Sequence, residues 1–503
     1  MIQSNSKTGA SKARSNTSLE AYFQPFRENI IGYNETFPTP YGEKKMIYAD
    51  WTASGRLYGP IEAKISQQMG PFVANTHTET TVTGTAMTMA YNRAKTIIKK
   101  HVGADGDDVL IMAGSGMTGA VNKFQRILGL KICEKLQKYT NVPDSERPVV
   151  FVTHKEHHSN HTSWLETIAH VERIEPTKDG FVDLNYLEIL LDKYKDRRVK
   201  IAAVTSCSNV TGLQTPYHQI AKIMHQHNGW CFVDFACSGP YIDINMHPKD
   251  ELEKLDAIYF SPHKFLGGPG TSGVLIFDKQ LYSNKIPDHP GGGTVAWTNP
   301  WGDHQYFDDI EAREDGGTPP FLQTIKTALC VQLKEKMGVE KILQREHELL
   351  QRIFAALKPI KNLHILAEEH EDRLGVISFY IEDLHYNLGV KLLNDHFGVQ
   401  TRGGCACAGT YGHYLLDIDL QTSKSITDVI NAGDLSVKPG WIRLSIHPTM
   451  TNQEVDYTLA AIQHIAANHA EMFKDYEYCS RHNEFKNCLG DDFEKDLVEE
   501  WFS

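Results

Sequence analysis

The stretch LDAIYFSPHKFLGGPGTSGVLIF, from Leu255 to Phe277, decides the fold of this chain. Two apolar runs, Leu255–Phe260 and Val274–Phe277, predict neighbouring buried strands. The Gly- and Pro-rich loop between them carries Ser261, His263 and Lys264. A lysine at the end of a buried strand is partly desolvated, which lowers the pKa of its amine and lets the amine hold an aldehyde covalently. A solvated loop lysine is the alternative, and the rest of the chain favours the functional interpretation.

Other strand-like runs are each followed by small or polar residues, and they alternate with helical segments. Because open α/β sheets bind ligands beyond the carboxyl ends of their strands, these residues point to one crevice. The alternation predicts an α/β fold with a mostly parallel sheet wrapped by helices. The alternative interpretation of Asp234 is an aspartate that caps a helix or forms a turn. The strand-end residues are Gly114–Thr118 after Val109–Met112, His157 after Val149–Thr153, Asn209 after Val199–Ser206, and Asp234 at the end of WCFVDFA.

The segment AGSGMTG opens a helix directly after a strand, which suits a phosphate group. Small residues let backbone amides approach an anion, and the helix N-terminus adds positive potential. The segment is neither a GxGxxG fingerprint nor a Walker loop, since no GK[ST] follows it. A Gly-rich turn that binds no phosphate is the alternative.

The stretch NTHTETTVTGT, Asn75–Thr85, is dense in threonine. It is too polar for a core and long enough to be functional, so we predict a loop, with a solvated connection as the alternative. The segment Met87–Val102 that follows predicts an amphipathic helix with basic residues at its end.

The chain divides into four segments by its apolar runs and its charge. Residues 1–18 are polar and predict a disordered tail, and residues 19–320 predict a large domain with an N-terminal lead-in. A long helix predicted at Phe321–Met337 marks the passage to a smaller α+β domain, residues 321–473. The late strand of that domain, Trp441–Ser445, carries Arg443, and residues 474–503 form a charged C-terminal extension.

Composition excludes several classes of protein. The 503 residues are 41% hydrophobic and 23% charged, which is ordinary for a soluble enzyme. With 51 Lys and Arg against 63 Asp and Glu, the net charge of −12 argues against a nucleic-acid partner. No apolar run reaches the length of a membrane span, so no membrane partner is expected. The nine cysteines are scattered and odd in number, which favours reduced thiols and a cytoplasmic location.

Four histidines in the segment HKEHHSNH suggest a metal site as one hypothesis. No HExxH motif is present, and only Glu156 adds a carboxylate, so we expect no metal. The competing functional hypothesis places one histidine against a flat cofactor ring, while helix capping and surface exposure account for others.

With these residues in view, the chain resembles the class V aminotransferase-like enzymes of fold type I, and within them the cysteine desulfurase and selenocysteine lyase branch. The motifs SPHKFLGGPGTSGVLIF, EHHSN, SNVTG, VDFAC, GSGMTGAVN and REDGGTP carry the resemblance, which runs from about Tyr48 to about Ile465. The resemblance implies pyridoxal 5′-phosphate (PLP) as cofactor. It also implies a large domain with a seven-stranded, mostly parallel sheet, and a smaller α+β C-terminal domain.

The resemblance also implies roles for individual residues. Lys264 would hold PLP, Asp234 would pair with its pyridinium nitrogen, and His157 would stack on its ring. Arg443 falls where the family binds the substrate carboxylate, and its rigid fork suits that group. Asn209 would contact both cofactor and substrate. Met117, Thr118, Ser261 and His263 are the other expected cofactor contacts, and Thr294, in GGGT, would reach the phosphate of a neighbouring subunit, which implies a homodimer.

The segment RGGCAC adds a candidate nucleophile. Arg402, Gly404 and Cys407 match the desulfurase pattern Arg-x-Gly-x-x-Cys, in which a loop cysteine attacks the substrate sulfur and leaves as a persulfide. A loop thiol near a cationic arginine is expected to have a lowered pKa. The resemblance thus implies a cysteine or selenocysteine substrate and a sulfur-acceptor protein, with Cys405 as a second thiol. The alternatives are a structural Cys407 and an aminotransferase, epimerase or β-lyase without sulfur transfer.

The sequence departs from the family pattern at three places. Cys237 replaces the glutamine of VDGAQ, which alters the expected contact with the phenolic oxygen of the cofactor. Thr78 stands beside His77 where a basic residue is expected. The C-terminus is longer than in typical members, and the sequence assigns it no role.

Overall fold

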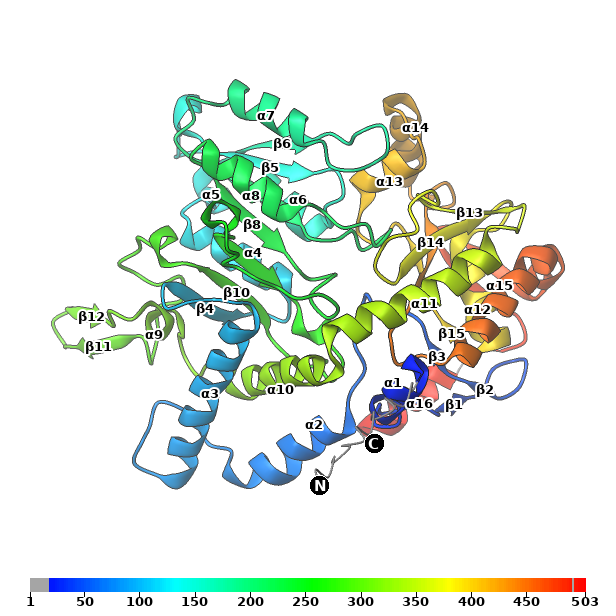
Figure 1. Cartoon of the computed structure of the whole chain (residues 1–503), viewed down its shortest axis with the longest axis horizontal. Coiled ribbons are helices and arrows are strands. Elements are labelled where there is room, and N and C mark those ends of the chain that lie inside the picture. The colour runs from blue at the N-terminus through cyan, green and yellow to red at the C-terminus, as the bar shows by residue number, and fades with distance from the viewer. Residues whose placement is uncertain (1–17, 491–492) are drawn as a thin grey trace, which may run out of the picture.

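The computed structural model describes residues 18–490 and 493–503, and Figure 1 shows their arrangement. Its centre is a seven-stranded sheet in the order β4-β10-β9-β8-β7-β5-β6. The pairs from β9 to β6 are parallel, whereas β10 is antiparallel to both β4 and β9. The expected mostly parallel, seven-stranded sheet is thus confirmed. The strands are β4 (Asp108–Ala113), β5 (Val149–Thr153), β6 (His170–Ile174), β7 (Lys200–Thr205), β8 (Trp230–Asp234), β9 (Ala257–Phe260) and β10 (Gly273–Asp278).

Both faces of this sheet are buried, because side chains along each strand alternate between two hydrophobic clusters. On β4, Leu110 and Met112 pack into one cluster, and Val109 and Ile111 pack into the other. Burial on both faces is typical of parallel strands covered by helices. It also explains why these strands are continuous apolar runs in the sequence.

Helices cover each face of the sheet. Those named α4 and α6 add their apolar residues to one cluster, and α3, α7, α8 and α10 add theirs to the other. The resulting three layers agree with the expected α/β class. Among the described residues, none of these or the other helices combines the length and apolarity needed to span a bilayer. The bounds are α3 (Val82–His101), α4 (Met117–Ile127), α6 (His158–Leu165), α7 (Leu184–Lys193), α8 (Tyr217–Gln226) and α10 (Phe321–Met337).

Helix α3 begins earlier than the sequence predicts, inside the stretch expected to be a loop. Thr81 is its N-cap, and the Thr81 side chain accepts a hydrogen bond from the amide of Gly84 at 3.2 Å. Threonine is polar but caps helices well, so a Thr-rich stretch is compatible with a helix start. The predicted loop Asn75–Thr85 is therefore shorter in the structure.

A second, four-stranded antiparallel sheet lies in the C-terminal part of the chain, in the order β13-β14-β17-β16. Helix α12 packs on its strands β16 and β17, and α11 packs on α15. Helix α10 and strand β17 have the bounds that the sequence predicts. The elements of this part are α11 (Val339–Leu357), β13 (Leu363–Ile365), β14 (Val376–Ile381), α12 (Tyr386–Phe397), β16 (Arg402–Gly404), β17 (Trp441–Ser445) and α15 (Asn452–Met472).

The N-terminal segment lies against this C-terminal part. Helix α1 (Leu19–Arg27) packs on α11, and β3 (Ile47–Tyr48) pairs in parallel with β15 (Val399–Gln400). The predicted boundaries after residues 320 and 473 stay predictions. The predicted tail, residues 1–18, lies outside the described residues except for Ser18, which caps α1.

Several short or exposed elements were not predicted from the sequence. They include two hairpins, β11–β12 and β18–β19, and three helices near the C-terminus. Helix α14, for example, has no buried residue, although its Ile426 and Ile430 line an apolar pocket. The bounds of these and of the remaining elements are β1 (Thr36–Phe37), β2 (Lys44–Lys45), α2 (Gly59–Ala63), α5 (Glu134–Gln137), β11 (Val295–Thr298), β12 (His304–Tyr306), α9 (Ile310–Glu314), α13 (Gly409–Leu415), α14 (Leu420–Asn431), β18 (Tyr476–Cys479), β19 (Glu484–Asn487) and α16 (Phe493–Phe502).

Candidate active site

One cavity of about 320 Å³ lies where several central strands end in loops. Most of the residues that the sequence singles out line it, although they come from distant parts of the chain. Thr294 is outside this lining. The predicted residues that line the cavity are Met117, Thr118, His157, Asn209, Asp234, Ser261, His263, Lys264, Cys407 and Arg443.

Lys264 ends a short helical turn, Pro262–Lys264, directly after β9. Strands β9 and β10 pair on either side of the loop, as the sequence predicts. Burial lowers the pKa of Lys264, although the nearby Cys237 and Asp234 act to raise it. More of this amine is therefore free than in an exposed lysine, which suits a nucleophile toward an aldehyde.

Asp234 is the last residue of β8, and its side chain is buried beside the cavity. Its Oδ1 accepts a hydrogen bond from the amide of Ala236 at 2.8 Å. Burial raises the pKa of Asp234 to about 6, while the Ala236 amide and Lys264 act to lower it. A buried carboxylate of this kind favours a cationic partner, such as a protonated ring nitrogen.

Two loops stack into a cradle at the N-terminus of α4. The amide of Met117 donates to Ser261 Oγ at 2.8 Å, and His263 Nδ1 lies 3.0 Å from the carbonyl oxygen of Ser115. A Cβ on Gly116 would lie 2.9 Å from His263 Cε1, so a side chain here would force the loops apart. The first turn of α4 leaves backbone amides without helical partners, and these attract anions. The cradle can therefore hold a phosphate.

His157 caps α6 at the wall of the same cavity. Its Nδ1 accepts a hydrogen bond from the amide of Ser159 at 3.1 Å. Burial lowers the pKa of His157 to about 3, and the positive charge of Lys264 acts in the same direction. The ring is therefore neutral, with its proton on Nε2. A flat neutral ring is suited to stack on an aromatic cofactor.

Asp50 holds two arginines at the cavity, and sequence reasoning missed it. Its carboxylate accepts from Arg443 Nη2 at 2.7 Å and from Arg402 Nε at 2.9 Å. Arg443 is only 3% exposed, whereas the side chain of Arg402 is 51% exposed. Asp50 follows β3 in the N-terminal segment, so it reaches the site only through tertiary contacts. Its position just after a short strand resembles that of Asp234 and was the available signal.

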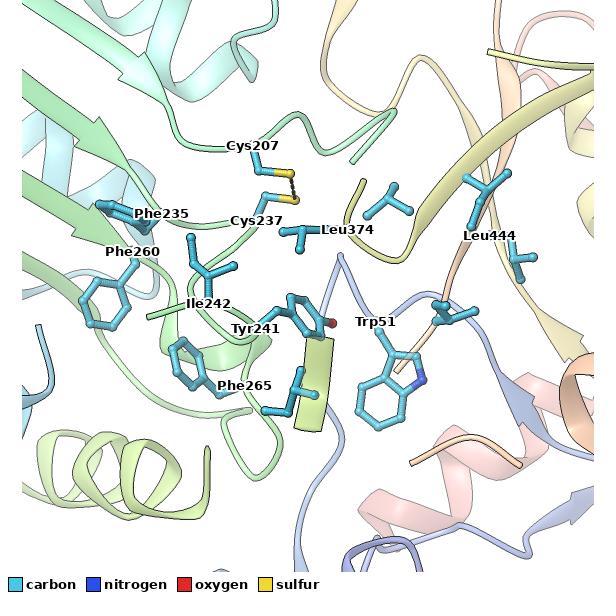
Figure 2. Packing of buried hydrophobic residues seen from close by; sticks show 14 of the residues in the cluster. Trp51, Cys207, Phe235, Cys237, Tyr241, Ile242, Phe260, Phe265, Leu374 and Leu444 are labelled. Carbon is cyan, nitrogen blue, oxygen red and sulfur yellow. Dashed lines mark hydrogen bonds between the residues drawn. The ribbon is translucent and has the colours of Figure 1, made fainter. Parts of the chain in front are cut away.

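Cys237 and Cys207 form a buried thiol pair beside the cavity. Their Sγ atoms are 3.9 Å apart, and Figure 2 shows them facing each other next to Leu374. The thiol of Cys207 lowers the pKa of Cys237, helped by the positive charge of Lys264, whereas burial acts to raise it. Where the resembling family has glutamine, this chain therefore offers sulfur to the cavity.

The two thiols of the RGGCAC segment belong to different cavities. Cys407 is exposed and lines the main cavity, whereas Cys405 is half-buried and lines a separate apolar pocket between α13, α14 and β17. Ala406 and Cys407 both have left-handed backbone, with φ of 51° and 56°. Each such non-glycine residue costs about 1 kcal/mol, so its surroundings must hold it. One support is Asn209, whose Nδ2 donates to the Ala406 carbonyl at 2.7 Å.

Thr294 lies next to the β11–β12 hairpin, away from the cavity lining. Its Oγ1 donates to the carbonyl of Gly291 at 2.6 Å. The hairpin extends from the body of the molecule in Figure 1 and carries the exposed Trp297 and Trp301. Thr294 therefore does not reach the cavity of its own chain.

The four clustered histidines make different contacts, although those of His158 and His161 fall on the neighbouring residues Gly409 and Thr410. His154 is buried against Tyr411 and Tyr414, and His157 faces the cavity. Nε2 of His158 accepts from the amide of Gly409. Within the described ranges, the one group with the spacing of metal ligands lies elsewhere, at Asp105, Asp108 and His247.

Comparisons with known proteins agree on one family. The model of the aminotransferase class-V family matches residues 47–458. A probable cysteine desulfurase of Staphylococcus epidermidis is 27% identical over 369 residues, 73% of this chain and 84% of that protein. Another, of Halalkalibacterium halodurans, is 26% identical over 367 residues, 72% of this chain and 84% of that protein.

Solved structures share the fold. An apo cysteine desulfurase of Thermococcus onnurineus superposes with a TM-score of 0.71 at 22% identity, covering 88% of this chain and 98% of that one. A cysteine desulfurase of Escherichia coli gives 0.68 at 18% identity, covering 89% and 98%. Since the family match spans most of the sequence, the chain belongs to the aminotransferase class-V family of PLP-dependent enzymes.

Proposed function

We propose that this chain is a PLP-dependent cysteine desulfurase, which takes sulfur or selenium from cysteine-type amino acids and carries it as a persulfide on Cys407. The observation that carries the proposal is that Cys407 lines the same cavity as Lys264. A thiol beside an amine that can hold an aldehyde is placed to react with a substrate bound there. The relatives named probable cysteine desulfurases support it.

The donor set of the cavity fits PLP. Lys264 would hold its aldehyde carbon, Asp234 would pair with its ring nitrogen, and His157 would lie on its ring. The cradle leaves no room for a side chain at Gly116 and lies at the N-terminus of α4, which suits the phosphate group. When bound, PLP supplies an electron sink that stabilises negative charge at the substrate α-carbon.

Residues of this chain would bind the substrate, move its proton and take its sulfur. The guanidinium of Arg443 would bind the substrate carboxylate as a rigid fork, and Asp50 would hold that fork in place. The free amine of Lys264 would move the proton at the substrate α-carbon. The Cys407 thiolate would attack the substrate sulfur, so that a new S–S bond forms as the Cβ–S bond breaks. The electron pair of the broken bond stays with the carbon skeleton, which takes up a proton to give alanine.

We also infer a homodimer and a protein that accepts the sulfur. Thr294 does not reach its own cavity, and the β11–β12 hairpin beside it exposes 85% of Trp301. A second copy that covers this hairpin would bring Thr294 toward the phosphate cradle of its neighbour. All nine cysteines are free thiols, which supports the cytoplasmic location expected from the sequence.

The test is a visible spectrum followed by sulfide release from L-cysteine in the presence of a reductant. Wild type is expected to be yellow and to release sulfide. Cys407→Ala should stay yellow and lose sulfide release, whereas the matched control Cys405→Ala should retain it. A yellow wild-type protein without sulfide release, or release that is indifferent to Cys407, would favour an aminotransferase, epimerase or β-lyase. A colourless protein that PLP does not restore would overturn the role of Lys264.

A further inference from the structure

His158, the first residue of α6, is hydrogen-bonded to the chain on both sides of Ala408, directly after Cys407. Its backbone amide donates to the carbonyl of Cys407 at 2.8 Å. Its side-chain Nε2 accepts from the amide of Gly409 at 2.9 Å. A Cβ on Gly409 would lie only 3.2 Å from that nitrogen, so the contact is also closely packed. A single residue thus holds the thiol-bearing loop at two points.

The conformation of this loop needs such support. Ala406 and Cys407 are consecutive left-handed residues with side chains, and backbone of this kind persists only where the surroundings hold it. Asn209 supplies a third contact, to the carbonyl of Ala406. The two holding residues follow different central strands, β5 and β7, so these contacts connect the loop to the edge of the seven-stranded sheet.

We propose that His158 is a positioning residue that keeps the Cys407 thiol at the cavity wall, and that it does so without taking part in cofactor binding. The role of the thiol rests on the function proposed above, but the contacts of the loop do not. Among the residues that line the main cavity His158 is absent, whereas its neighbour His157 is present. The two adjacent histidines therefore have separate tasks, one toward the cavity and one toward the loop.

The contact with Gly409 requires an unprotonated Nε2, because a protonated imidazole donates from both nitrogens. Burial lowers the pKa of His158, and the positive charge of Lys438 acts in the same direction. From the same helix, His157 and His161 face it with pKa values that burial also lowers. On the loop itself, the titratable groups are the thiols of Cys405 and Cys407. The acceptor is thus available at neutral pH.

The test compares PLP-loaded wild type, His158→Ala and His158→Gln by amide hydrogen exchange and by kinetics. In His158→Ala, exchange in the peptide 405–411 should rise and kcat for sulfide release should fall about fivefold, which corresponds to one hydrogen bond of about 1 kcal/mol. KM and the visible band should not change, because Lys264 and Arg443 are untouched. In His158→Gln, the side-chain oxygen can accept from Gly409, so both effects should be largely reversed.

Two further variants serve as a control and as a second perturbation of the same contact. His170→Ala removes an imidazole that pairs with Asp144 and does not line the main cavity, so loop exchange and kcat should stay at wild-type values. Gly409→Ala crowds Nε2 from the other side and should act like His158→Ala, even if the latter fails to fold. Unchanged exchange and kcat in both His158→Ala and Gly409→Ala would overturn the proposal. A wild type that releases no sulfide would instead refute the proposed function, and exchange alone would then decide on the positioning role.

Discussion

Replacing Asp50 by asparagine should affect the two arginines that share its carboxylate to different degrees. The substitution keeps the size and one acceptor oxygen of the side chain but removes its charge. Arg443 is 3% exposed and loses its ion-pair partner, whereas the half-exposed Arg402 can turn to water. Two positive charges then face each other across the site without the carboxylate between them.

The expected loss in the free energy of unfolding follows from the burial of each partner. Removing one member of a buried ion pair costs about 3 to 5 kcal/mol, because the remaining charge stays desolvated. The retained acceptor oxygen of asparagine puts the expected loss for Asp50→Asn near the lower end, at about 3 kcal/mol. Arg402→Ala is the matched control, since it breaks the exposed arm of the same bridge and should cost less than about 1 kcal/mol.

Urea unfolding of the cofactor-free protein at neutral pH measures both free energies of unfolding. In the PLP-loaded protein, KM for cysteine should rise in Asp50→Asn, because Arg443 is no longer held in register with the substrate carboxylate. The visible band should stay, because Asp50 does not line the cavity. If Asp50→Asn and Arg402→Ala lower the free energy of unfolding equally, the assignment of Asp50 as the support of a buried charge is wrong.

Three other outcomes are expected. Because the pKa of Asp234 is raised to about 6, its carboxylate is ionised above that pH and neutral below it. PLP affinity should therefore fall by up to about tenfold per unit as pH drops below 6, and Asp234→Asn, measured by fluorescence titration, should lack this dependence. Gly116→Ala should weaken PLP binding, because its Cβ would lie 2.9 Å from His263, whereas Gly106→Ala, which meets open space, should not; equal affinities would refute the cradle. Trp301→Ser should shift the protein toward monomer in analytical ultracentrifugation, and an unchanged dimer would exclude the hairpin as an interface.

The elements best predicted from the sequence are those whose burial is complete. Strands such as β9 and β10 are covered on both faces, so nearly every residue must be apolar and the run is visible in the sequence. The edge strand β6, HVERI, has only Ile174 fully buried and leaves no such run. Helix α14 is missed for the same reason, since its packing buries no residue.

The candidate site was predicted where it sits at strand ends. Parallel strands bring their carboxyl ends to one edge, so Asp234, Asn209 and Lys264 could be grouped from the order of strands and helices along the chain. Asp50 and His158 were not recognised for their contacts. Asp50 belongs to the N-terminal segment. The contact of His158 that matters is its hydrogen bond to the amide of Gly409, 251 residues later in the chain. Such pairings depend on which surfaces meet, and local patterns do not encode that.

By itself, the amino-acid sequence determined the layered α/β fold, the aminotransferase class-V family and the set of residues at the strand ends. Apolar runs and glycine-rich turns are local signals that predict the fold class and the strand-end residues, whereas the family was indicated by the resemblance of motifs such as EHHSN and SNVTG. Only the tertiary structure decided which of the two loop thiols faces the main cavity, which anion holds Arg443 and which histidine fastens the loop. Those outcomes depend on the packing of segments far apart in the chain, where one hydrogen bond or one buried charge chooses among residues that look equivalent in the sequence.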